Sequence, residues 1–358
     1  MLLAASLRLL YSLLGLFLTP RLRLDPVLIR SNELTDNLMQ RADGLAYSLL
    51  GIWERFDTLW YLEIARHGYE RAASVVFYPL YPLLIRAGTA LGAPPLAAAL
   101  AISTFSATLL FWGLLELLAL DLPEDTTRRA ALLLAAWPGS FIFFAAYPES
   151  LVLALTIWSI LFARRGVWWA AGITGLLAGL AKAAGVLVIV PLAVLAWRER
   201  KARVWPGALS LLAPVVMALV LMGSRQSLPA GAYGEYWRTE IAFPLVTLWA
   251  SVRQAIAGDN LLLRMNLGML LLVGAAALWK RLRLEYTLYT IAALCLFLTK
   301  KTDPLLQSTM RYVLVIFPAH AAMAGILRSR VGLMGGAALL MIVNLFLMVS
   351  FFEWSLVL

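Results

Sequence analysis

The sequence has few charged residues, which make up 14% of its 358 residues against 62% that are hydrophobic. A soluble domain carries roughly 25% charged residues. Apolar runs long enough to cross a membrane recur along the whole chain, so most of its surface must face lipid. The composition excludes an ordinary soluble protein and predicts a polytopic membrane protein.

The sequence also lacks the residue patterns that commonly bind metals, nucleotides or nucleic acids. Its one cysteine, Cys295, cannot form a disulfide within the chain, and its two histidines, His67 and His320, stand at no metal-ligand spacing. It contains no Gly-rich phosphate loop, no G-x-G-x-x-G turn and no Asp-x-Asp pair. The net charge of +10 forms no basic stripe, so nucleic acid is not an expected partner. An already activated substrate, such as a lipid-linked phosphate, or an ion gradient is the expected energy source.

Apolar length predicts about eleven membrane-spanning helices in one membrane-embedded domain, residues 1–358. The predicted spans are residues 2–19, which we expect to be retained rather than cleaved, 94–120, 130–147, 149–163, 167–181, 185–197, 205–223, 265–279, 285–299, 312–327 and 331–352. Two long loops, 20–93 and 224–263, separate groups of spans. The stretch FYPLYPLLIR, residues 77–86, is too short and too rich in proline to span, and is predicted to be re-entrant or interfacial.

Basic residues are concentrated in alternate connections between the predicted spans. Thirteen of the 30 Lys and Arg residues fall in five short connections, at 128–129, 164–165, 198–203, 280–283 and 328–330. The positive-inside rule makes that side cytoplasmic, together with the N-terminus. The loops 20–93 and 224–263, the turn near residue 148 and the segment 300–311 then share the extracytoplasmic side.

Two ridges of small residues predict close contacts between helices. One is Gly172, Gly175 and Gly179, and the other is Gly332 with Gly336. No internal repeat of the kind found in inverted-repeat transporters occurs in the sequence.

The densest group of polar and aromatic residues runs from Trp53 to Pro82. Asp57 and Tyr61 stand four residues apart on one face of a predicted helix, and Glu54 precedes Asp57 by about one turn. If this helix lies along the membrane surface, its aromatic residues sit at the level of the headgroups. Asp57 would then be placed to act as a general base on an acceptor hydroxyl. The alternative is an interfacial aromatic belt with solvated charges.

Three further charged residues occupy unusual places in the apolar part of the chain. Glu149 follows a turn between two spans, where it either caps the helix beginning at Ser150 or reaches the same site as Asp57. Lys182 is the only charge in a long apolar stretch, so it either faces a cavity or extends to the interface. Arg311, with Lys300 nearby in sequence, is suited either to a phosphate or to anchoring a span at the interface.

These segments resemble the PIG-V family, the mannosyltransferases known for adding the second mannose in GPI-anchor assembly, and its bacterial relatives. The resemblance rests on RFDTLWYLEIARHGY with FYPLYPLLIR, on FFAAYPESL, on GLAKAAGVLVIVPL and on STMRYVLVIFP. These motifs follow the family's order over about residues 53–318. Lys182 stands where the family usually has arginine, and the loop before Trp53 matches no family element.

The resemblance implies an all-α bundle of the GT-C type, with interfacial helices in a large first extracytoplasmic loop. It implies an inverting glycosyltransferase that moves a hexose, mannose in this family, from a polyprenyl- or dolichyl-phosphate donor to a lipid- or polymer-linked acceptor. The family's aspartate, glutamate and arginine correspond to Asp57, Glu149 and Arg311. Expected partners are the donor lipid, membrane lipids and an unidentified acceptor.

On this hypothesis Asp57 is the catalytic base, and Arg311, Lys182 and Lys300 bind the donor phosphate. Sugar and acceptor hydroxyls would be bound by Glu54, Tyr61, His67, Tyr81, Tyr147, Glu149 and Tyr312. No metal site is predicted and no cofactor is required, although a divalent cation at the phosphate would be compatible with these residues.

Two other classes of protein remain as alternatives. A transporter of lipids or sugar-lipids would carry ionisable residues near the middle of several spans, whereas here the charges gather at span ends and in loops. A non-catalytic subunit with the same fold would tolerate the loss of Asp57, Lys182 and Arg311, and all three are present.

Overall fold

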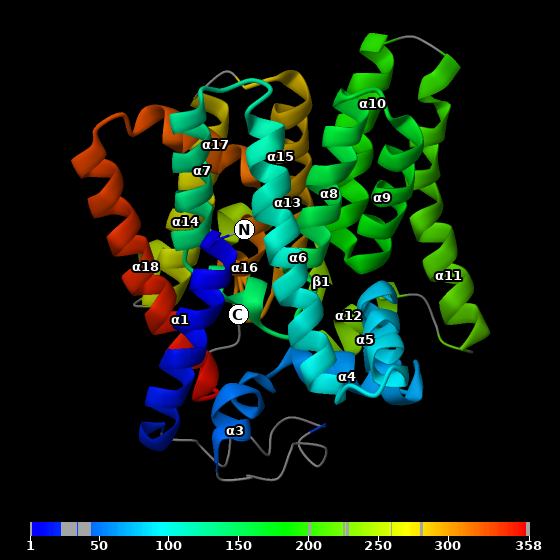
Figure 1. Ribbon diagram of the computed structural model, residues 1–358, viewed down its shortest axis with the longest axis vertical. Coiled ribbons are helices and arrows are strands. Elements are labelled where there is room, and N and C mark those ends of the chain that lie inside the picture. Colours follow the sequence, from blue (N-terminus) through cyan, green and yellow to red (C-terminus); the bar gives the residue numbers. More distant parts are fainter. Residues whose placement is uncertain are drawn as a thin grey trace.

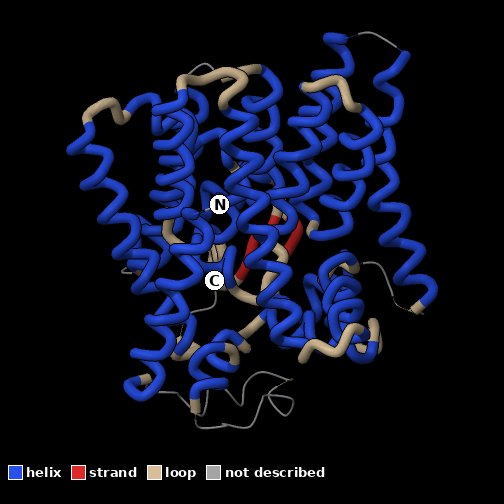
Figure 2. The backbone as a smooth tube through the Cα atoms, viewed as in Figure 1, coloured by secondary structure: helices blue, strands red, loops and turns tan. Residues whose placement is uncertain are grey.

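The structure is a computed structural model that describes residues 2–22, 34, 44–199, 202–224, 226, 229–258, 260–279 and 282–355. Most of this part of the chain is helical, and its only strands form one antiparallel pair (Figures 1 and 2). The predicted all-α membrane fold is therefore confirmed, with the strand pair as an unpredicted addition. Much of the first predicted loop, at 23–33 and 35–43, lies outside the described residues.

Five helices in the described ranges are long and apolar enough to cross a membrane alone. They are α1 (Leu2–Leu18, continued by η1, Thr19–Arg21), α6 (Pro95–Leu118), α11 (Ala213–Gly223, preceded by η7, Ala202–Leu212), α14 (Leu261–Trp279) and α18 (Arg330–Phe352). A sixth span results if α16 (Thr309–Tyr312) with η8 (Val313–Val315) and α17 (Phe317–Ile326), bent by 82°, count as one. Two shorter apolar helices are α9 (Trp168–Ala181) and α15 (Leu284–Leu298).

The other predicted spans are helices that irregular turns shorten. The segment 130–147 is α7 (Glu124–Ala136) followed by η5 (Ser140–Phe144), because the chain turns at Gly139, whose φ of +88° favours glycine. The segment 185–197 divides into η6 (Ala183–Val188) and α10 (Ile189–Glu199), and α8 covers Glu149–Arg164. Each predicted span coincides with helix, but fewer than the eleven or so predicted have spanning length.

The basic connections gather at one end of the bundle, which we call the basic end. Arg164 and Arg283 both bind Asp121, with N–O distances of 2.8 and 3.2 Å, and Arg198 binds the buried Glu285 at 2.8 Å. Figure 1 shows the connection between α17 and α18 at the same, upper end. The prediction that these loops share one side is thus supported by direct contacts.

Short helices occupy the opposite end of the molecule. These are α3 (Leu45–Leu49), α4 (Asp57–His67) and α5 (Leu80–Ala90), which Figure 1 shows at the lower end, with η3 (Gly51–Trp53) and η4 (Ala72–Val76) between them in sequence. With 11 residues, α5 is too short to span a bilayer, as predicted for its proline-rich stretch.

The second predicted loop folds back over the first. Its helix α12 (Pro229–Trp237) lies against η4, where the indole N–H of Trp237 donates to the carbonyl of Ala73 at 3.1 Å. After α12 come the strand β1 (Thr239–Ile241) and the helix α13 (Pro244–Ala257). Strand β1 pairs antiparallel with β2 (Lys300–Thr302), with Thr239 opposite Thr302. The strand pair ties the loop 224–263 to the segment 300–311.

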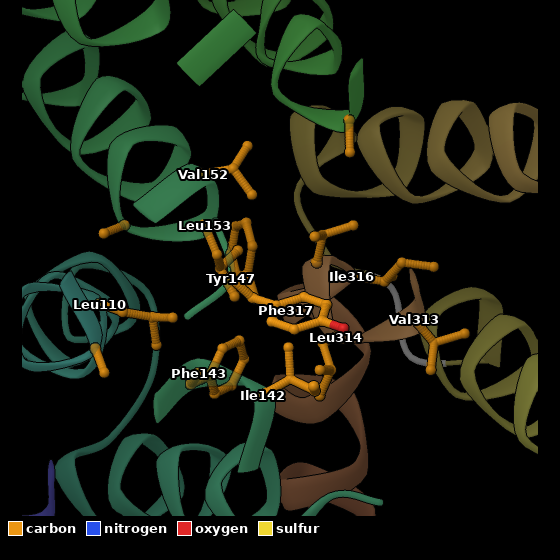
Figure 3. Close-up of a cluster of buried hydrophobic side chains, with 14 of the residues drawn as sticks. Leu110, Ile142, Phe143, Tyr147, Val152, Leu153, Val313, Leu314, Ile316 and Phe317 are labelled. Carbon is orange, nitrogen blue, oxygen red and sulfur yellow. The ribbon is translucent and has the colours of Figure 1, made fainter. Parts of the chain in front are cut away.

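An apolar cluster fixes the elements that end near the centre of the molecule. Figure 3 shows Phe143 of η5, Leu153 of α8 and Phe317 of α17 together with Leu314 and Tyr147. Within a membrane, such side chains hold helices together through close van der Waals packing. The start of α8 and the segment around α16 therefore have fixed positions relative to each other.

The glycine ridge on α9 is a contact surface, as predicted. A Cβ added at Gly172 would lie 2.0 Å from the carbonyl oxygen of Pro206, and one added at Gly179 would lie 2.5 Å from the Cβ of Ala213. The second predicted ridge is wrong within the described chain, because a Cβ at Gly336 would meet nothing within 4 Å.

Replacing Gly172 by alanine should lower the free energy of unfolding by about 1–3 kcal/mol, because the added methyl group forces α9 and η7 apart. Thermal unfolding of the purified protein in detergent measures the effect. Gly268→Ala on α14 is the matched control, since its Cβ would meet nothing within 4 Å. Equal melting temperatures for the two variants would contradict the close approach of α9 to η7.

Candidate active site

Asp57 is held at the first turn of α4 by the residues around it. The preceding Phe56 has a φ of +49°, and its ring lies against Phe351 and Trp354 at centroid distances of 5.5 and 4.9 Å. The backbone N–H of Asp57 donates to the hydroxyl of Tyr147 at 3.1 Å. A carboxylate at a helix N-terminus is also favoured by the helix dipole.

Three charged residues from distant parts of the sequence are linked to Asp57 through ion pairs. Glu149 is the first residue of α8, and Lys182 lies in extended conformation where α9 passes into η6. Arg311 lies on the single turn of α16, which begins after Ser308, a residue with φ of +63°. Each of them is thus placed where a helix starts, breaks or turns.

These side chains form a continuous chain of ion pairs. Arg311 Nη1 lies 2.5 Å from Asp57 Oδ2, and Arg311 Nε lies 3.2 Å from Glu149 Oε1. The same Glu149 oxygen accepts a hydrogen bond from Lys182 Nζ. The order is therefore Asp57, Arg311, Glu149, Lys182, and the four formal charges cancel. Glu149 and Arg311 are buried, so the pairs lie away from bulk water.

Lys300 adds a cation that no carboxylate neutralises among the described residues. Its Nζ donates to the hydroxyl of Tyr233 at 3.2 Å and lies 5.6 Å from the ring centroid of Tyr312. Lys182 and Arg311 lie 5.4 and 5.3 Å from the same ring. Although burial opposes the charged form, the hydroxyls of Tyr312 and Tyr233 raise the pKa of Lys300, which keeps its ammonium group charged.

A cavity of about 150 Å³ opens beside these charges. Asp57, Lys182, Lys300 and Arg311 all line it. The cavity thus combines an oxygen that can accept a proton with three cations that can bind an anion. This is the arrangement needed for moving a group away from a phosphate.

The structure brings six of the eleven predicted site residues to the cavity wall. They are Asp57, Tyr61, Lys182, Lys300, Arg311 and Tyr312. Burial and the negative charges of Glu149 and Asp57 raise the pKa of Tyr61 well above its ordinary value, so its hydroxyl stays protonated and can donate a hydrogen bond.

The other five predicted residues do not line this cavity. They are Glu54, His67, Tyr81, Tyr147 and Glu149. Glu149 is 1% exposed and pairs with Arg311 and Lys182, which line the cavity in its place. Tyr147 accepts a hydrogen bond from the backbone N–H of Asp57 at the start of α4. The hydroxyl of Tyr81 donates to the carbonyl of Ala99 at 3.0 Å, Glu54 is buried, and His67 is exposed at the end of α4.

Several residues of the wall were not predicted. Tyr233, Trp237 and Thr239 come from α12 and β1, while Thr302, Gln307 and Ser308 come from the segment before Arg311. Trp237 also forms an aromatic group with Trp60 and Phe77, at centroid distances of 5.6 and 5.5 Å. Within the sequence these residues stand in polar loops without a recognisable spacing. The one sequence feature that could have indicated them is that they belong to the segments 224–263 and 300–311, which are predicted to lie on the same side of the membrane as Asp57.

The described residues contain no group of three or more His, Cys, Asp and Glu side chains that could hold a metal ion. In this structure the facing oxygens of Asp57 and Glu149 are occupied by Arg311 and Lys182. The expectation that no cofactor is required stays a prediction.

Comparison with known sequences points to one family. The family described as "Mannosyltransferase (PIG-V)" matches residues 1–198, more than half of the chain. The chain is similar to "GPI alpha-1,6-mannosyltransferase 2" of Mus musculus, with 32% identity over 158 residues, which cover 41% of this chain and 32% of that protein. It is similarly related to the Rattus norvegicus protein of that name, with 30% identity over 221 residues, covering 56% of this chain and 44% of that protein. The matched regions span less than half the length of these relatives.

Comparison with solved structures supports the fold. The structure resembles ArnT from Cupriavidus metallidurans, crystallised bound to undecaprenyl phosphate, with a TM-score of 0.51 and 17% identity. The match covers 80% of this chain and 57% of ArnT. The fold is thus that of a GT-C-type membrane protein, as predicted.

Replacing Glu149 by glutamine should destabilise the protein by about 3–5 kcal/mol, because it leaves the cations of Arg311 and Lys182 facing each other in a buried site. Thermal or chemical unfolding measures the change. Glu116→Gln is the matched control, because the exposed pair of Glu116 with Arg165 contributes about 1 kcal/mol or less. Comparable losses in the two variants would show that Glu149 is not the residue that holds the cations together.

Proposed function

Because the chain belongs to the mannosyltransferase (PIG-V) family, we propose that it is an inverting glycosyltransferase with a polyprenyl-phosphate sugar as donor. The sugar is a hexose, with mannose suggested by the names of its relatives. The observation that carries the proposal is the meeting of Asp57 with Arg311, Lys182 and Lys300 in one cavity. A carboxylate and a group of cations are what transfer from a phosphate to a hydroxyl requires.

The donor is held through its phosphate. The cations of Arg311 and Lys182 are balanced by Asp57 and Glu149, so Lys300 supplies the excess positive charge that attracts an anion. Arg311 adds a planar group suited to phosphate oxygens. The likeness in fold to ArnT, which binds undecaprenyl phosphate, supports a lipid-linked phosphate as the donor.

The reaction is a single displacement. An acceptor hydroxyl oxygen attacks the anomeric carbon while the bond from that carbon to the phosphate oxygen breaks, and the electron pair of this bond stays on the phosphate. Asp57 takes the proton of the hydroxyl. Arg311, Lys182 and Lys300 stabilise the additional negative charge of the departing polyprenyl phosphate. One displacement inverts the anomeric carbon.

The remaining site residues bind the sugar or hold the machinery in place. Tyr61 and Tyr312 face the cavity and have hydroxyls for the sugar, and Trp237 presents an aromatic ring for its apolar face. Glu149 and Tyr147, which lie behind the wall, position Arg311 and the start of α4.

We place the cavity on the extracytoplasmic side, with the N-terminus in the cytoplasm. Asp57, Trp237 and Lys300 belong to the segments opposite the basic end, and the positive-inside rule assigns the basic end to the cytoplasm. A donor carried by a membrane lipid is accessible there without a soluble nucleotide sugar.

The direct test is incubation of the purified protein with radiolabelled polyprenyl-phosphate mannose and an extract of membrane lipids. Transfer of label to a new lipid or polymer is the expected result. A transporter would move the donor across a vesicle membrane without forming a new glycoside, and a non-catalytic subunit would do neither.

Asp57→Asn should lower the rate of transfer by roughly 10²–10⁴-fold, because it keeps the shape of the side chain and removes the proton acceptor. Binding of undecaprenyl phosphate should persist, since Arg311 loses a competing carboxylate. Asp125→Asn, at the basic end, is the control and should retain wild-type transfer. Wild-type transfer by Asp57→Asn would rule out Asp57 as the base.

Lys300→Gln should weaken binding of undecaprenyl phosphate by about tenfold, which corresponds to the loss of one charge-assisted contact of about 1.4 kcal/mol. Lys301→Gln should bind normally, because the neighbouring Lys301 pairs with Glu240 and does not line the cavity. Binding of the lipid phosphate in detergent measures both. Equal affinities for the two variants would remove Lys300 from the phosphate site.

A further inference from the structure

A second cavity, of about 220 Å³, lies next to the candidate active site. Its polar lining comes from the start of α14, with Asn260 and Asn266, from Gln307 and Ser308, and from Ser355 just beyond α18. Because α14 and α18 are both long enough to cross the membrane, a lipid lying beside these helices has its headgroup within reach of this cavity.

One short segment forms the wall between the two cavities. Gln307 and Ser308 line both of them. Two residues further along, Met310 lines the second cavity, and the next residue, Arg311, lines the active-site cavity. A molecule in the second cavity would therefore be separated from the donor phosphate site by the thickness of a single segment.

Asn266 is a polar side chain without a partner in this cavity. It is 5% exposed and lines the cavity, and its carboxamide makes no hydrogen bond within the described chain. The side chain of Gln307, at the wall, likewise makes no hydrogen bond to described residues. Two carboxamides are thus free to bind a ligand that carries hydroxyl groups.

The backbone of the wall is strained. Leu306 and Ser308 have φ values of +56° and +63°, a region that residues other than glycine seldom adopt. Such conformations cost roughly 1–3 kcal/mol each and persist where the surrounding structure enforces them, commonly at functional sites. They hold Gln307 between them, at the boundary of both cavities.

The chemistry of the lining defines the ligand. The described side chains of the second cavity are carboxamides, hydroxyls and apolar groups, and none of them is charged. The active-site cavity, by contrast, is lined by Asp57 and three cations. An anionic headgroup would find its partners in the first cavity and none among the described residues of the second.

We infer that the second cavity binds the acceptor, and that the acceptor is an uncharged lipid with a hydroxyl-bearing headgroup. Asn266 and Gln307 hydrogen-bond its hydroxyls, and the reactive hydroxyl extends past the side chains of Gln307 and Ser308 toward Asp57. The inference rests on the proposed function and adds the chemical class of the acceptor to it.

The test separates a membrane lipid extract by anion exchange into uncharged and acidic fractions and offers each with labelled polyprenyl-phosphate mannose. Label should enter the uncharged fraction. Asn266→Leu and the more exposed Gln307→Ala should each raise the half-saturating concentration of that fraction by about tenfold with little change in the maximal rate. Asn266→Leu, which lies outside the active-site cavity, should bind undecaprenyl phosphate normally, which also shows that it is folded. Lys301→Gln is the control without effect.

Label entering only the acidic fraction would overturn the inference and leave the proposed function intact. So would half-saturating concentrations that are the same in wild type and in both variants. A wild-type protein that binds undecaprenyl phosphate and labels neither fraction would overturn the proposed function, and the assignment of the acceptor with it.

Discussion

Arg311 lies between two carboxylates, Asp57 and Glu149, inside a largely apolar bundle, and the architecture around it follows from the need to pair these charges. A buried guanidinium without partners would cost several kcal/mol. It is stabilised only if the first residues of α4 and α8 meet α16 at the same place. Lys182, where α9 ends, then completes the charge balance. The apolar cluster around Phe143 and Phe317 holds those ends together, so packing and electrostatics specify the same geometry.

Under the proposed function, the same charge balance explains how the site can accept an anionic donor. The four linked charges cancel, while Lys300 remains positive and shares the ring of Tyr312 with Lys182 and Arg311. A phosphate entering near Lys300 would compete with Asp57 for Arg311, which would leave Asp57 a better proton acceptor. In the proposed reaction, donor binding and activation of the base are two consequences of one exchange of ion-pair partners. The neutral second cavity beside it adds a place for an acceptor that brings no charge of its own.

The sequence predicts those site residues whose charge is energetically unfavourable in the apolar segments around them, or whose position in a helix is unusual. Lys182 and Arg311 stand out because charge in apolar segments needs a partner, and Asp57 because it begins a helix rich in aromatic residues. Sequence could not give the role of Glu149, since its position behind the cations depends on where α8 meets α16. Nor could it reveal Trp237, which reaches the cavity only because β1 pairs with β2 and α12 rests on η4. Helical content was predictable from apolar length, whereas the number of full spans was not, because local turns such as that at Gly139 divide apolar segments.

The account depends on a proton acceptor and phosphate-binding cations sharing one cavity, and an experimental structure with bound undecaprenyl phosphate tests this most directly. It predicts the phosphate in the cavity between α4 and α16, in contact with Lys300 and Arg311, with the carboxylate of Asp57 moved away from Arg311. A phosphate bound elsewhere on the bundle, with the pair of Asp57 and Arg311 unchanged, would contradict it.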